Sequence, residues 1–465
     1  MNRMVLLQVS VMCVLIFSFI INAEESVSAN AEYNSRLKFG FWSRMTLGQV
    51  VSSTKEPGYD IPFDKEWLET VDGGIKVNYK LTPSLTGRLN LGVVINLATV
   101  SPREMRTFEY SAKKVAPALL DACLEYQTKG VLFDNDQFNI ELGYFPFKYN
   151  QQSTNLGEYL FRSGTYPGWL INGFEHSIDK PKLAGVHASY TVGSSVSLKQ
   201  DLLMNTELDV FPYRDIHLTY IATPSFGKFL NLGVGVQFAR LIALDHRKTT
   251  LGTDSFYKGR FEPYVGYIDP ASGDTIRYTF KGTKAMGRAM FDVKELFGLG
   301  SKILGKQDLK IYGEVALLGV KDYPGWYQLK KERSPMMVGF NFPAFKILDV
   351  LSVEVQRYKT PYINTQDYIW KASSAVPYVP GRVSPMDYDR EWNDSTMAVT
   401  DDDIRWSIYA SKQLGKHIRL SAQAACDNTP KNWYTPWPAP QSAKYSDIVP
   451  KNDDWYFMVR MSIYF

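Results

Sequence analysis

Apolar side chains occupy every second position of the final segment of the chain, Trp455 to Phe465. Alternate residues of a β-strand point to opposite faces, so this segment would present one apolar face and one face able to meet water. The apolar face holds Trp455, Phe457, Val459, Met461, Ile463 and Phe465, and the opposite face holds Tyr456, Met458, Arg460, Ser462 and Tyr464. A chain that repeats this pattern must fold so that its strands share one apolar surface.

The same alternation recurs along the chain and predicts sixteen strands, separated in places by turn residues such as Thr82-Pro83-Ser84 and Thr223-Pro224-Ser225. The predicted strands are 35–47, 73–82, 85–97, 119–128, 137–147, 182–192, 196–207, 214–222, 229–241, 275–291, 307–319, 333–343, 349–358, 403–413, 417–426 and 454–465. The apolar phase changes inside 275–291, which indicates a bulge near Gly282 or a misplaced boundary. Asp292 to Glu295 has the spacing of a helical cap, which indicates one helical turn.

Connection length alternates with strand number. Connections after even-numbered strands are mostly tight, whereas those after odd-numbered strands are mostly long, such as 98–118 and 359–402. A β-sandwich gives no reason for this segregation, but an outer-membrane barrel has short periplasmic turns and long extracellular loops. We therefore predict an all-β fold, in which residues 24–465 form a single closed antiparallel transmembrane β-barrel of about 16 strands.

The first 23 residues have the pattern of a secretory signal peptide, with Arg3 before an apolar run from Val5 to Ile21. We expect cleavage after Ala23, with a site as late as Ala31 as the alternative and a retained helical anchor as the rival interpretation. The expected location is the cell outer membrane, as an integral β-barrel with both mature termini in the periplasm.

Composition argues against several other classes of protein. The net charge of +4 is too small to indicate a nucleic-acid partner. Cys123 and Cys426 lie on predicted strands far apart around the barrel, so no disulfide is expected. No cofactor is expected, since no pair of His or Cys has metal-ligand spacing. The acidic stretch with Asp387, Asp389 and Glu391 is a weak calcium candidate, and a solvated external loop is the favoured interpretation.

Taken together, the signal peptide, the alternation and the terminal aromatic residue make the sequence resemble bacterial outer-membrane β-barrels of the porin type. In that family the last strand and its terminal aromatic residue are the signal read by the barrel-assembly machinery, and Ile463, Tyr464 and Phe465 stand at those positions. The resemblance also implies contacts with outer-membrane lipid and lipopolysaccharide, and assembly as a homotrimer.

If the apolar faces meet lipid, the opposite faces line the lumen. Basic residues at these positions form a basic wall on strands that become contiguous when the last strand pairs with the first: Arg36, Lys38, Arg44, Lys76, Lys80, Arg88, Arg405, Arg419 and Arg460. No acidic residue is assigned to the interior of this wall before Asp427 at its rim. Acidic lumen positions fall on other strands: Asp121, Glu125, Glu141, Asp201, Asp215, Glu314 and Glu354. We predict that the two sets face each other across the lumen; the alternative is that lumen charges pair with neighbours or only solvate the interior.

The third long connection, 150–180, is the predicted constriction, because in porins the third external loop folds inward. Glu158 and Arg162 have helical i, i+4 spacing, and Leu156, Tyr159 and Leu160 would anchor that turn to the wall. The candidate constriction residues are Glu158, Tyr159, Arg162 and Trp169.

A sixteen-stranded cylinder is wide enough for an aqueous channel unless something fills it. The sequence therefore predicts a porin-like channel for passive diffusion of small hydrophilic solutes. The alternative is a surface-exposed barrel whose long loops bind glycans or partners and which conducts little; Trp433, Tyr434 and Trp437 could then stack on sugars. We do not expect an enzyme, because none of the five histidines lies beside a nucleophile motif.

Overall fold

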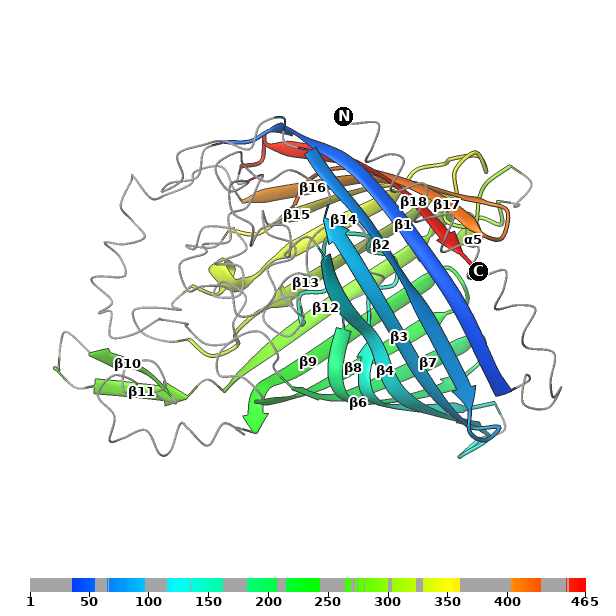
Figure 1. Ribbon diagram of the computed structural model, residues 1–465. Helices are drawn as coiled ribbons and strands as arrows, with labels where there is room; N and C mark the ends of the chain where they lie inside the picture. Colours follow the sequence, from blue (N-terminus) through cyan, green and yellow to red (C-terminus); the bar gives the residue numbers. More distant parts are fainter. Residues whose placement is uncertain are drawn as a thin grey trace.

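The described chain forms one closed sheet of sixteen antiparallel strands and one separate two-stranded hairpin in this computed structural model (Figure 1). The structure describes residues 36–54, 65, 67–96, 115–133, 135–161, 182–206, 215–242, 264–268, 272–273, 275–279, 281–299, 303–322, 329–359, 403–427, 449 and 451–465. The predicted fold class, a closed antiparallel barrel of sixteen strands, is confirmed.

The barrel strands are β1 (Leu37–Ser52), β2 (Trp67–Lys80), β3 (Leu85–Asn96), β4 (Val115–Lys129), β5 (Gln137–Pro146), β6 (Lys182–Gly193), β7 (Val196–Thr206), β8 (Ile216–Phe226), β9 (Leu230–Ile242), β12 (Gly282–Asp292), β13 (Lys310–Leu317), β14 (Met336–Asn341), β15 (Val350–Arg357), β16 (Ile404–Leu414), β17 (Ile418–Cys426) and β18 (Trp455–Tyr464). The remaining elements are the hairpin β10 (Tyr264–Ile268) and β11 (Thr275–Thr279), the helical turn α5 (Val293–Leu296) and the 3₁₀ turn η4 (Lys330–Arg333). Neighbours in the barrel follow chain order, except that β9 pairs with β12 and β18 returns to β1.

The terminal strand closes the barrel. β18 pairs with β1 in an antiparallel register that sets Met461 opposite Met45. Past the end of this ladder, the Phe41 N–H donates to the Phe465 carbonyl at 3.0 Å, and the Phe465 N–H donates to the Phe41 carbonyl at 2.8 Å. The ring of His417, in the turn before β17, stacks on the Phe465 ring with centroids 5.7 Å apart. The last residue is therefore held from both sides of the closing seam.

Side chains alternate between the lumen and the outer surface along most of the barrel, with a register shift at Asn90 and Leu91 where β3 pairs with β4. On β18 the even-numbered residues Tyr456, Met458 and Arg460 are buried inside, whereas Val459 on the outer face is 50% exposed. Large apolar residues such as Leu91 and Val234 occupy outward positions on other strands in the same way. Soluble proteins do not expose a continuous apolar belt of this kind, so the outer surface suits a lipid environment.

No helix within these ranges is long and apolar enough to span a membrane.

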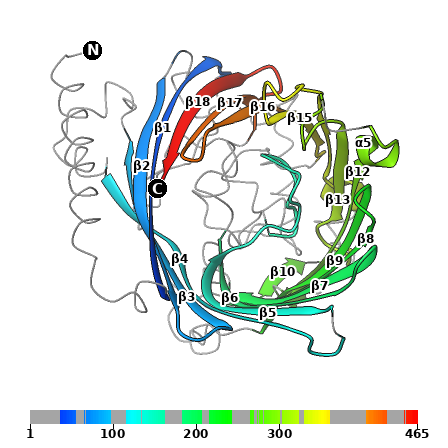
Figure 2. The same ribbon diagram turned by 90° about the vertical axis from the view of Figure 1, so that its right-hand side faces the viewer.

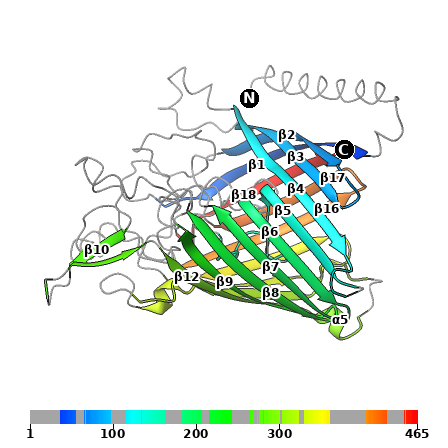
Figure 3. The ribbon, with the colours of Figure 1, turned by 90° about the horizontal axis from the view of Figure 1, so that it is seen from below.

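Short and long connections lie at opposite ends of the barrel. We call the end with the connections β2–β3, β4–β5, β6–β7, β8–β9, β12–β13, β14–β15 and β16–β17 the turn end, and the other the loop end. The C-terminus and α5 lie at the turn end, and the β10–β11 hairpin lies beyond the loop end (Figures 1 and 3). The predicted helical turn is α5, whose N-cap Asp292 accepts a hydrogen bond from the Glu295 N–H at 3.2 Å. The predicted segregation of connection lengths is confirmed.

Of the two explanations for the phase change inside 275–291, the misplaced boundary is correct. Residues Thr275–Thr279 pair with Tyr264–Ile268 outside the barrel, and the barrel strand begins at Gly282. The two apolar phases belong to two different strands. Strand β11 lies outside the barrel, and strand β12 has one face on the lumen.

The predicted turn at Thr223-Pro224-Ser225 is wrong, because β8 continues through these residues to Phe226. Pro224 pairs with Leu198 of β7, while the paired positions of β8 and β9 skip from Ala222 to Ser225. Proline has no N–H to give, and a gap in one ladder is where a strand tolerates it.

An arginine on the outer belt should destabilise the barrel far more than one on the inner face. Leu91→Arg places a charge in the lipid zone of β3 and should cost about 2–4 kcal/mol of unfolding free energy. Thr86→Arg, on the inner face of the same strand opposite Glu125, is the matched control and should change it little. Reversible unfolding in lipid vesicles measures both, and equal effects would contradict the assignment of the two faces.

Candidate functional site

The predicted lumen residues stand at inward positions of their strands. The basic ones are Lys38 and Arg44 on β1, Lys76 and Lys80 on β2, Arg88 on β3, Arg405 on β16, Arg419 on β17 and Arg460 on β18, with Arg36 directly before β1. The acidic ones are Asp121 and Glu125 on β4, Glu141 on β5, Asp201 on β7, Glu314 on β13 and Glu354 on β15, with Asp215 directly before β8. Their partners differ from the predicted arrangement in two respects.

First, the basic wall contains an acidic residue that the sequence analysis missed. Asp72 lies at an inward position of β2 and accepts a hydrogen bond from Arg44 Nε at 2.6 Å. The Arg44 guanidinium also stacks over the Trp42 ring, 4.4 Å from its centroid. Asp72 was overlooked because the predicted strand began at residue 73, whereas β2 begins at Trp67.

Second, the acidic residues of β4 and β5 do not face Arg88 across the lumen but lie beside it. Arg88 contacts Asp121 at 3.2 Å, Glu125 at 2.9 Å and Glu141 at 2.6 Å. Here the prediction of facing charges is wrong, and the alternative of pairing between neighbours holds. The register explains the result, since β3 and β4 place Thr86 opposite Glu125 and Asn90 opposite Asp121, on either side of Arg88.

The same network continues through a histidine. His187 on β6 lies between two carboxylates, with Nδ1 2.8 Å from Glu141 and Nε2 2.9 Å from Asp201. Lys199 then contacts Asp201 at 2.8 Å. Charged groups therefore run side by side from β3 to β7, where four carboxylates pair with Arg88, His187 and Lys199.

The described part of the third long connection packs inside the barrel. Figure 2 shows the segment that follows β5 inside the ring of strands. Its residues Leu156, Tyr159 and Leu160 are buried in a hydrophobic cluster with inward residues of β5 to β8 and β12 to β14. Gly235 on β9 makes room for this contact, because a Cβ there would lie 2.9 Å from Leu160. We call residues 147–161 the inner segment.

Two buried carboxylates, Glu314 on β13 and Glu354 on β15, hold the inner segment. Glu314, 3% exposed, accepts backbone hydrogen bonds from Glu158 at 3.0 Å and Tyr159 at 2.9 Å. Glu354, fully buried, accepts backbone hydrogen bonds from Asn155 and Leu156, both at 2.9 Å. Tyr149 and Asn150 add side-chain hydrogen bonds to Glu314, and Tyr312 adds one to Glu354. We call these two groups the carboxylate clamps.

The helical arrangement expected around Glu158 is not formed. Gly157 and Glu158 have φ values of +85° and +61°, which interrupt a right-handed helix. The Glu158 carboxylate turns back toward the chain and accepts the N–H groups of Tyr149 and Asn150, at 3.4 and 2.5 Å. Glu158 lies in a connection rather than a spanning strand, and burial together with the nearby Glu314 raises its pKa to about 7.

Val449, in the connection before β18, is buried against the barrel wall. Val449 packs with Val50, Ala425, Tyr456 and Met458 in a small hydrophobic cluster. Its carbonyl accepts a hydrogen bond from Arg405, which is fully buried. Arg405 therefore anchors the chain before β18, and Asp427 at the rim accepts a hydrogen bond from Tyr456 at 2.8 Å.

Two basic lumen residues on β12 were missed by the sequence analysis. Lys284 donates to the Leu160 carbonyl at 3.3 Å, and Arg288 donates to Asn231 at 2.7 Å and to Thr223 at 3.0 Å. They were missed because the predicted strand began at residue 275 and not at Gly282. With a strand beginning at Gly282, alternation alone places both on the inner face.

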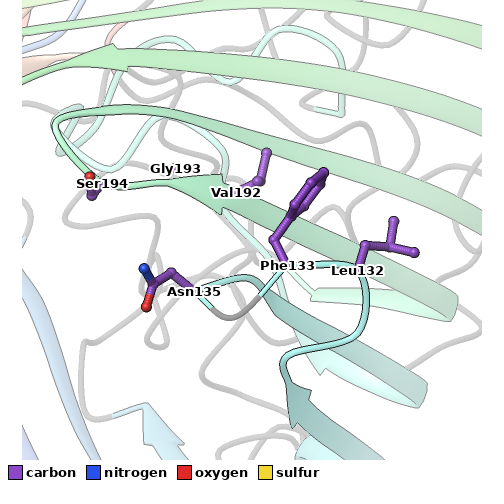
Figure 4. Close-up of a pocket in the computed structure, with 6 residues that line it drawn as sticks. All are labelled: Leu132, Phe133, Asn135, Val192, Gly193 and Ser194. Atoms are coloured by element: carbon purple, nitrogen blue, oxygen red, sulfur yellow. The ribbon is translucent and has the colours of Figure 1, made fainter.

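At the turn end, a concavity of about 500 Å³ lies between the β4–β5 and β6–β7 turns (Figure 4). It is lined by Leu132, Phe133, Asn135, Val192, Gly193 and Ser194. Asp136 shapes the first turn by accepting the N–H groups of Val131, Leu132 and Phe133. Among the described residues, none of the side chains that line the concavity is charged.

Several predicted residues and segments lie outside the described residues. They are the signal peptide 1–23 with its cleavage site, Arg162 and Trp169, the acidic loop with Asp387, Asp389 and Glu391, and the aromatic residues Trp433, Tyr434 and Trp437. Within the described ranges, no group of three or more His, Cys, Asp or Glu side chains has the geometry of a metal site. Cys123 and Cys426 are both buried free thiols.

No family model matches the sequence, and no curated protein matches it. Solved structures with a related overall fold include Pseudomonas putida OprB at 9% identity and a TM-score of 0.49, covering 93% of this chain and 95% of that chain. Salmonella typhi OmpF in complex with daunomycin has 10% identity and a TM-score of 0.44, covering 92% and 97%. A triple mutant of the Rhodopseudomonas blastica porin has 9% identity and a TM-score of 0.40, covering 92% and 100%. At these values the function has to be argued from this chain's own residues.

The architecture itself is that of a porin-type barrel. Sixteen antiparallel strands close on themselves, and their connections alternate between short and long. The inner segment, which is the described part of the third long connection, lies inside the barrel.

Removing both carboxylate clamps should release the inner segment. In a Glu314→Gln and Glu354→Gln double variant, each carboxylate becomes an amide with a single acceptor oxygen. Its NH2 group then faces a backbone N–H, and two donors cannot form a hydrogen bond. We expect a loss of about 2–3 kcal/mol per clamp, since hydrogen bonds to charged groups are worth that much. Faster proteolysis between residues 150 and 181 measures the release. Glu125→Gln, which pairs with Arg88, is the control; unchanged proteolysis of the double variant would show that the clamps do not hold the segment.

Docking of the inner segment should depend on pH through Glu158. Its pKa of about 7 in the docked segment lies above the ordinary value of 4.5, so protonation favours docking. This stabilisation is complete below the ordinary pKa and is lost as the pH rises through the docked value. Proteolysis of the segment should therefore accelerate between about pH 5 and about pH 8. Glu158→Gln should remove this pH dependence. If proteolysis of the variant still depended on pH, the dependence would belong to another titratable group.

Proposed function

We propose that the protein is an outer-membrane porin through which small hydrophilic solutes diffuse passively. The observation that carries this proposal is the inverted polarity of the closed sheet, with apolar side chains outside and charged ones inside. A soluble carrier would place these faces the other way round. A barrel of sixteen strands encloses more space than inward side chains alone can fill.

The position of the inner segment supports the interpretation that the lumen is narrowed and not filled. Its hydrophobic contacts are with the wall from β5 to β14, and its clamps are on β13 and β15. On the other side of the barrel, Lys38 and Lys80 remain exposed to solvent, and Lys76 and Arg419 are partly exposed. The proposed path for solutes runs between the inner segment and this wall.

The histidine network gives no support to an enzyme. A catalytic histidine needs one ring nitrogen free to take a proton from a nucleophile. Both nitrogens of His187 are within 3 Å of carboxylate oxygens, of Glu141 and Asp201. The geometry fits a structural link between β5 and β7.

The proposed function includes an orientation and partners. The turn end would face the periplasm, with both termini there, and the loop end would face lipopolysaccharide outside. Ile463, Tyr464 and Phe465 would be the signal for the barrel-assembly machinery, and a homotrimer is the proposed assembly. The seam contacts of Phe465 with Phe41 and His417 support a role for the last residue in closing the barrel.

A barrel that mainly binds glycans or partners through its loops is the second candidate. The observation that favours it is Val449 in the chain before β18, which packs against residues of β1, β17 and β18 and accepts a hydrogen bond from Arg405.

Conductance of the purified, folded protein in a planar lipid bilayer distinguishes these two functions. The porin should insert as discrete, long-lived ohmic steps, and neutral polar solutes should reduce the conductance up to a size limit. Folding is checked separately by heat-modified electrophoretic mobility. Folded protein that produces no steps would overturn the porin proposal in favour of the binding barrel.

A further inference from the structure

Two connections at the turn end carry large apolar side chains that the fold leaves exposed. They are the connection 293–309, which includes α5, and the connection 342–349 between β14 and β15. The exposed fractions of Phe297, Ile303 and Ile347 are 68%, 67% and 76%. Together with three further exposed apolar residues they form what we call the turn-end platform: Leu296, Phe297, Leu299, Ile303, Phe345 and Ile347. Apolar surface gathered in this way marks a site of contact with a protein or a membrane.

Buried polar groups hold the first connection in place. Lys294 is buried, and its ammonium group donates to the Asp292 carboxylate at 2.7 Å and to the Lys306 carbonyl at 2.8 Å. The two ends of the connection are thereby tied together. The buried face of α5 is the one with Lys294, and Leu296 and Phe297 lie on its exposed face.

The two connections are also joined to each other. Asp308 is fully buried, and its carboxylate accepts the N–H of Gly305 at 2.8 Å and the N–H of Phe345 at 3.3 Å. The Leu309 N–H donates to the Asn341 carbonyl at 3.0 Å. The platform therefore belongs to one braced surface and not to two independent turns.

The second connection contains a turn that places an aromatic residue in an unfavourable backbone conformation. The Ile347 N–H donates to the Ala344 carbonyl at 2.9 Å, and the residues between them, Phe345 and Lys346, have φ values of +51° and +62°. A turn with two successive positive φ angles favours Asn-Gly, and bulky side chains adopt such angles at a cost. Phe345 is nevertheless 54% exposed. The described residues do not bury it, which favours a compensating contact outside the chain.

The platform continues the apolar belt on the outer face of the barrel. Figure 2 shows α5 outside the ring of strands, beside β12. Outward residues of the adjoining strands are also apolar and exposed, including Ile311 on β13 and Val338 on β14. A surface at the edge of a lipid-facing belt lies where the lipid headgroups begin. Lys306 and Lys346 are exposed beside the platform, as suits side chains that reach lipid phosphates.

We infer that the turn-end platform lies in the headgroup region of the adjacent membrane leaflet and binds lipid there. An interfacial anchor of this kind buries its apolar side chains about 5–10 Å into the boundary between headgroups and acyl chains. The braced connections belong to the sector from β12 to β15, so the contact fixes the depth of the barrel in the membrane on that side. The inference rests on the membrane location in the proposed function and is independent of conduction.

The test attaches an environment-sensitive fluorescent probe to a single introduced cysteine in the folded protein in lipid vesicles. Phe297→Cys and Ile347→Cys place the probe on the platform, and Lys416→Cys, in the exposed β16–β17 turn at the same end, is the matched control. Cys123 and Cys426 are buried, and native protein treated with the probe gives the background. Lipids that carry a quencher beside the headgroup should quench the platform probes strongly. Aqueous iodide should quench these probes several-fold less than the probe at residue 416.

A probe on the outer belt separates failure of this inference from failure of the membrane location. In protein whose folding is checked by heat-modified electrophoretic mobility, Val338→Cys should respond to the lipid-borne quencher and not to iodide. Platform probes that iodide quenches as fully as residue 416, or equal lipid quenching at residue 416, would overturn the inference. Shielding of the platform probes from both quenchers would also overturn it and would assign the platform to a protein contact, such as a second copy of this chain. Iodide quenching at residue 338 itself would overturn the membrane location.

Discussion

Backbone hydrogen bonding between β18 and β1 closes the sheet, and the rest of the structure depends on that closure. In a hydrocarbon environment an unpaired N–H or C=O costs several kcal/mol, so an open edge is not tolerated there. The ladder from Trp42 to Ser52 against Trp455 to Tyr464, extended by the pair of bonds between Phe41 and Phe465, leaves no such edge at the seam. Closure also fixes which face is inside, since a shift of one residue would turn every side chain to the other face.

The pairing of β18 with β1 also brings basic residues from the two ends of the chain together. Arg460 reaches across it, and its Nε donates to Thr46 of β1 at 3.0 Å. Only through this pairing do the cations of β17 and β18 become neighbours of those on β1 and β2. Strands β13 and β15 use their carboxylates differently, since Glu314 and Glu354 bind backbone N–H groups of the inner segment. One wall thus holds the inner segment, and the other presents charge to the lumen.

Local patterns in the sequence were sufficient to predict the strand number, the closing strand and the inner face. Apolar and polar residues alternate with a period of two within the strands. The length of a connection indicates at which end of the barrel it lies. The errors occurred where a boundary was set by contacts far away in sequence. Asp72 was missed because β2 extends beyond the predicted start, and Lys284 and Arg288 were missed because a hairpin outside the barrel was joined to β12. The carboxylate clamps join residues 155 to 199 positions apart, and no local pattern records such a pairing.

The central claim is that a water-filled path runs between the inner segment and the wall formed by β1 and β2, and a pair of cysteine substitutions on β2 tests it most directly. The two substitutions are Lys76→Cys and Ile75→Cys. Residue 76 lies on the inner face of β2, and residue 75 lies beside it on the outer face. Single-channel current is recorded while a charged, membrane-impermeant thiol reagent is added to the aqueous phase. Cys123 and Cys426 are buried, and the native protein serves as the reference. The structure predicts a stepwise change in current for Lys76→Cys and none for Ile75→Cys. No reaction at residue 76 in a conducting barrel, or an equal reaction at residue 75, would contradict it.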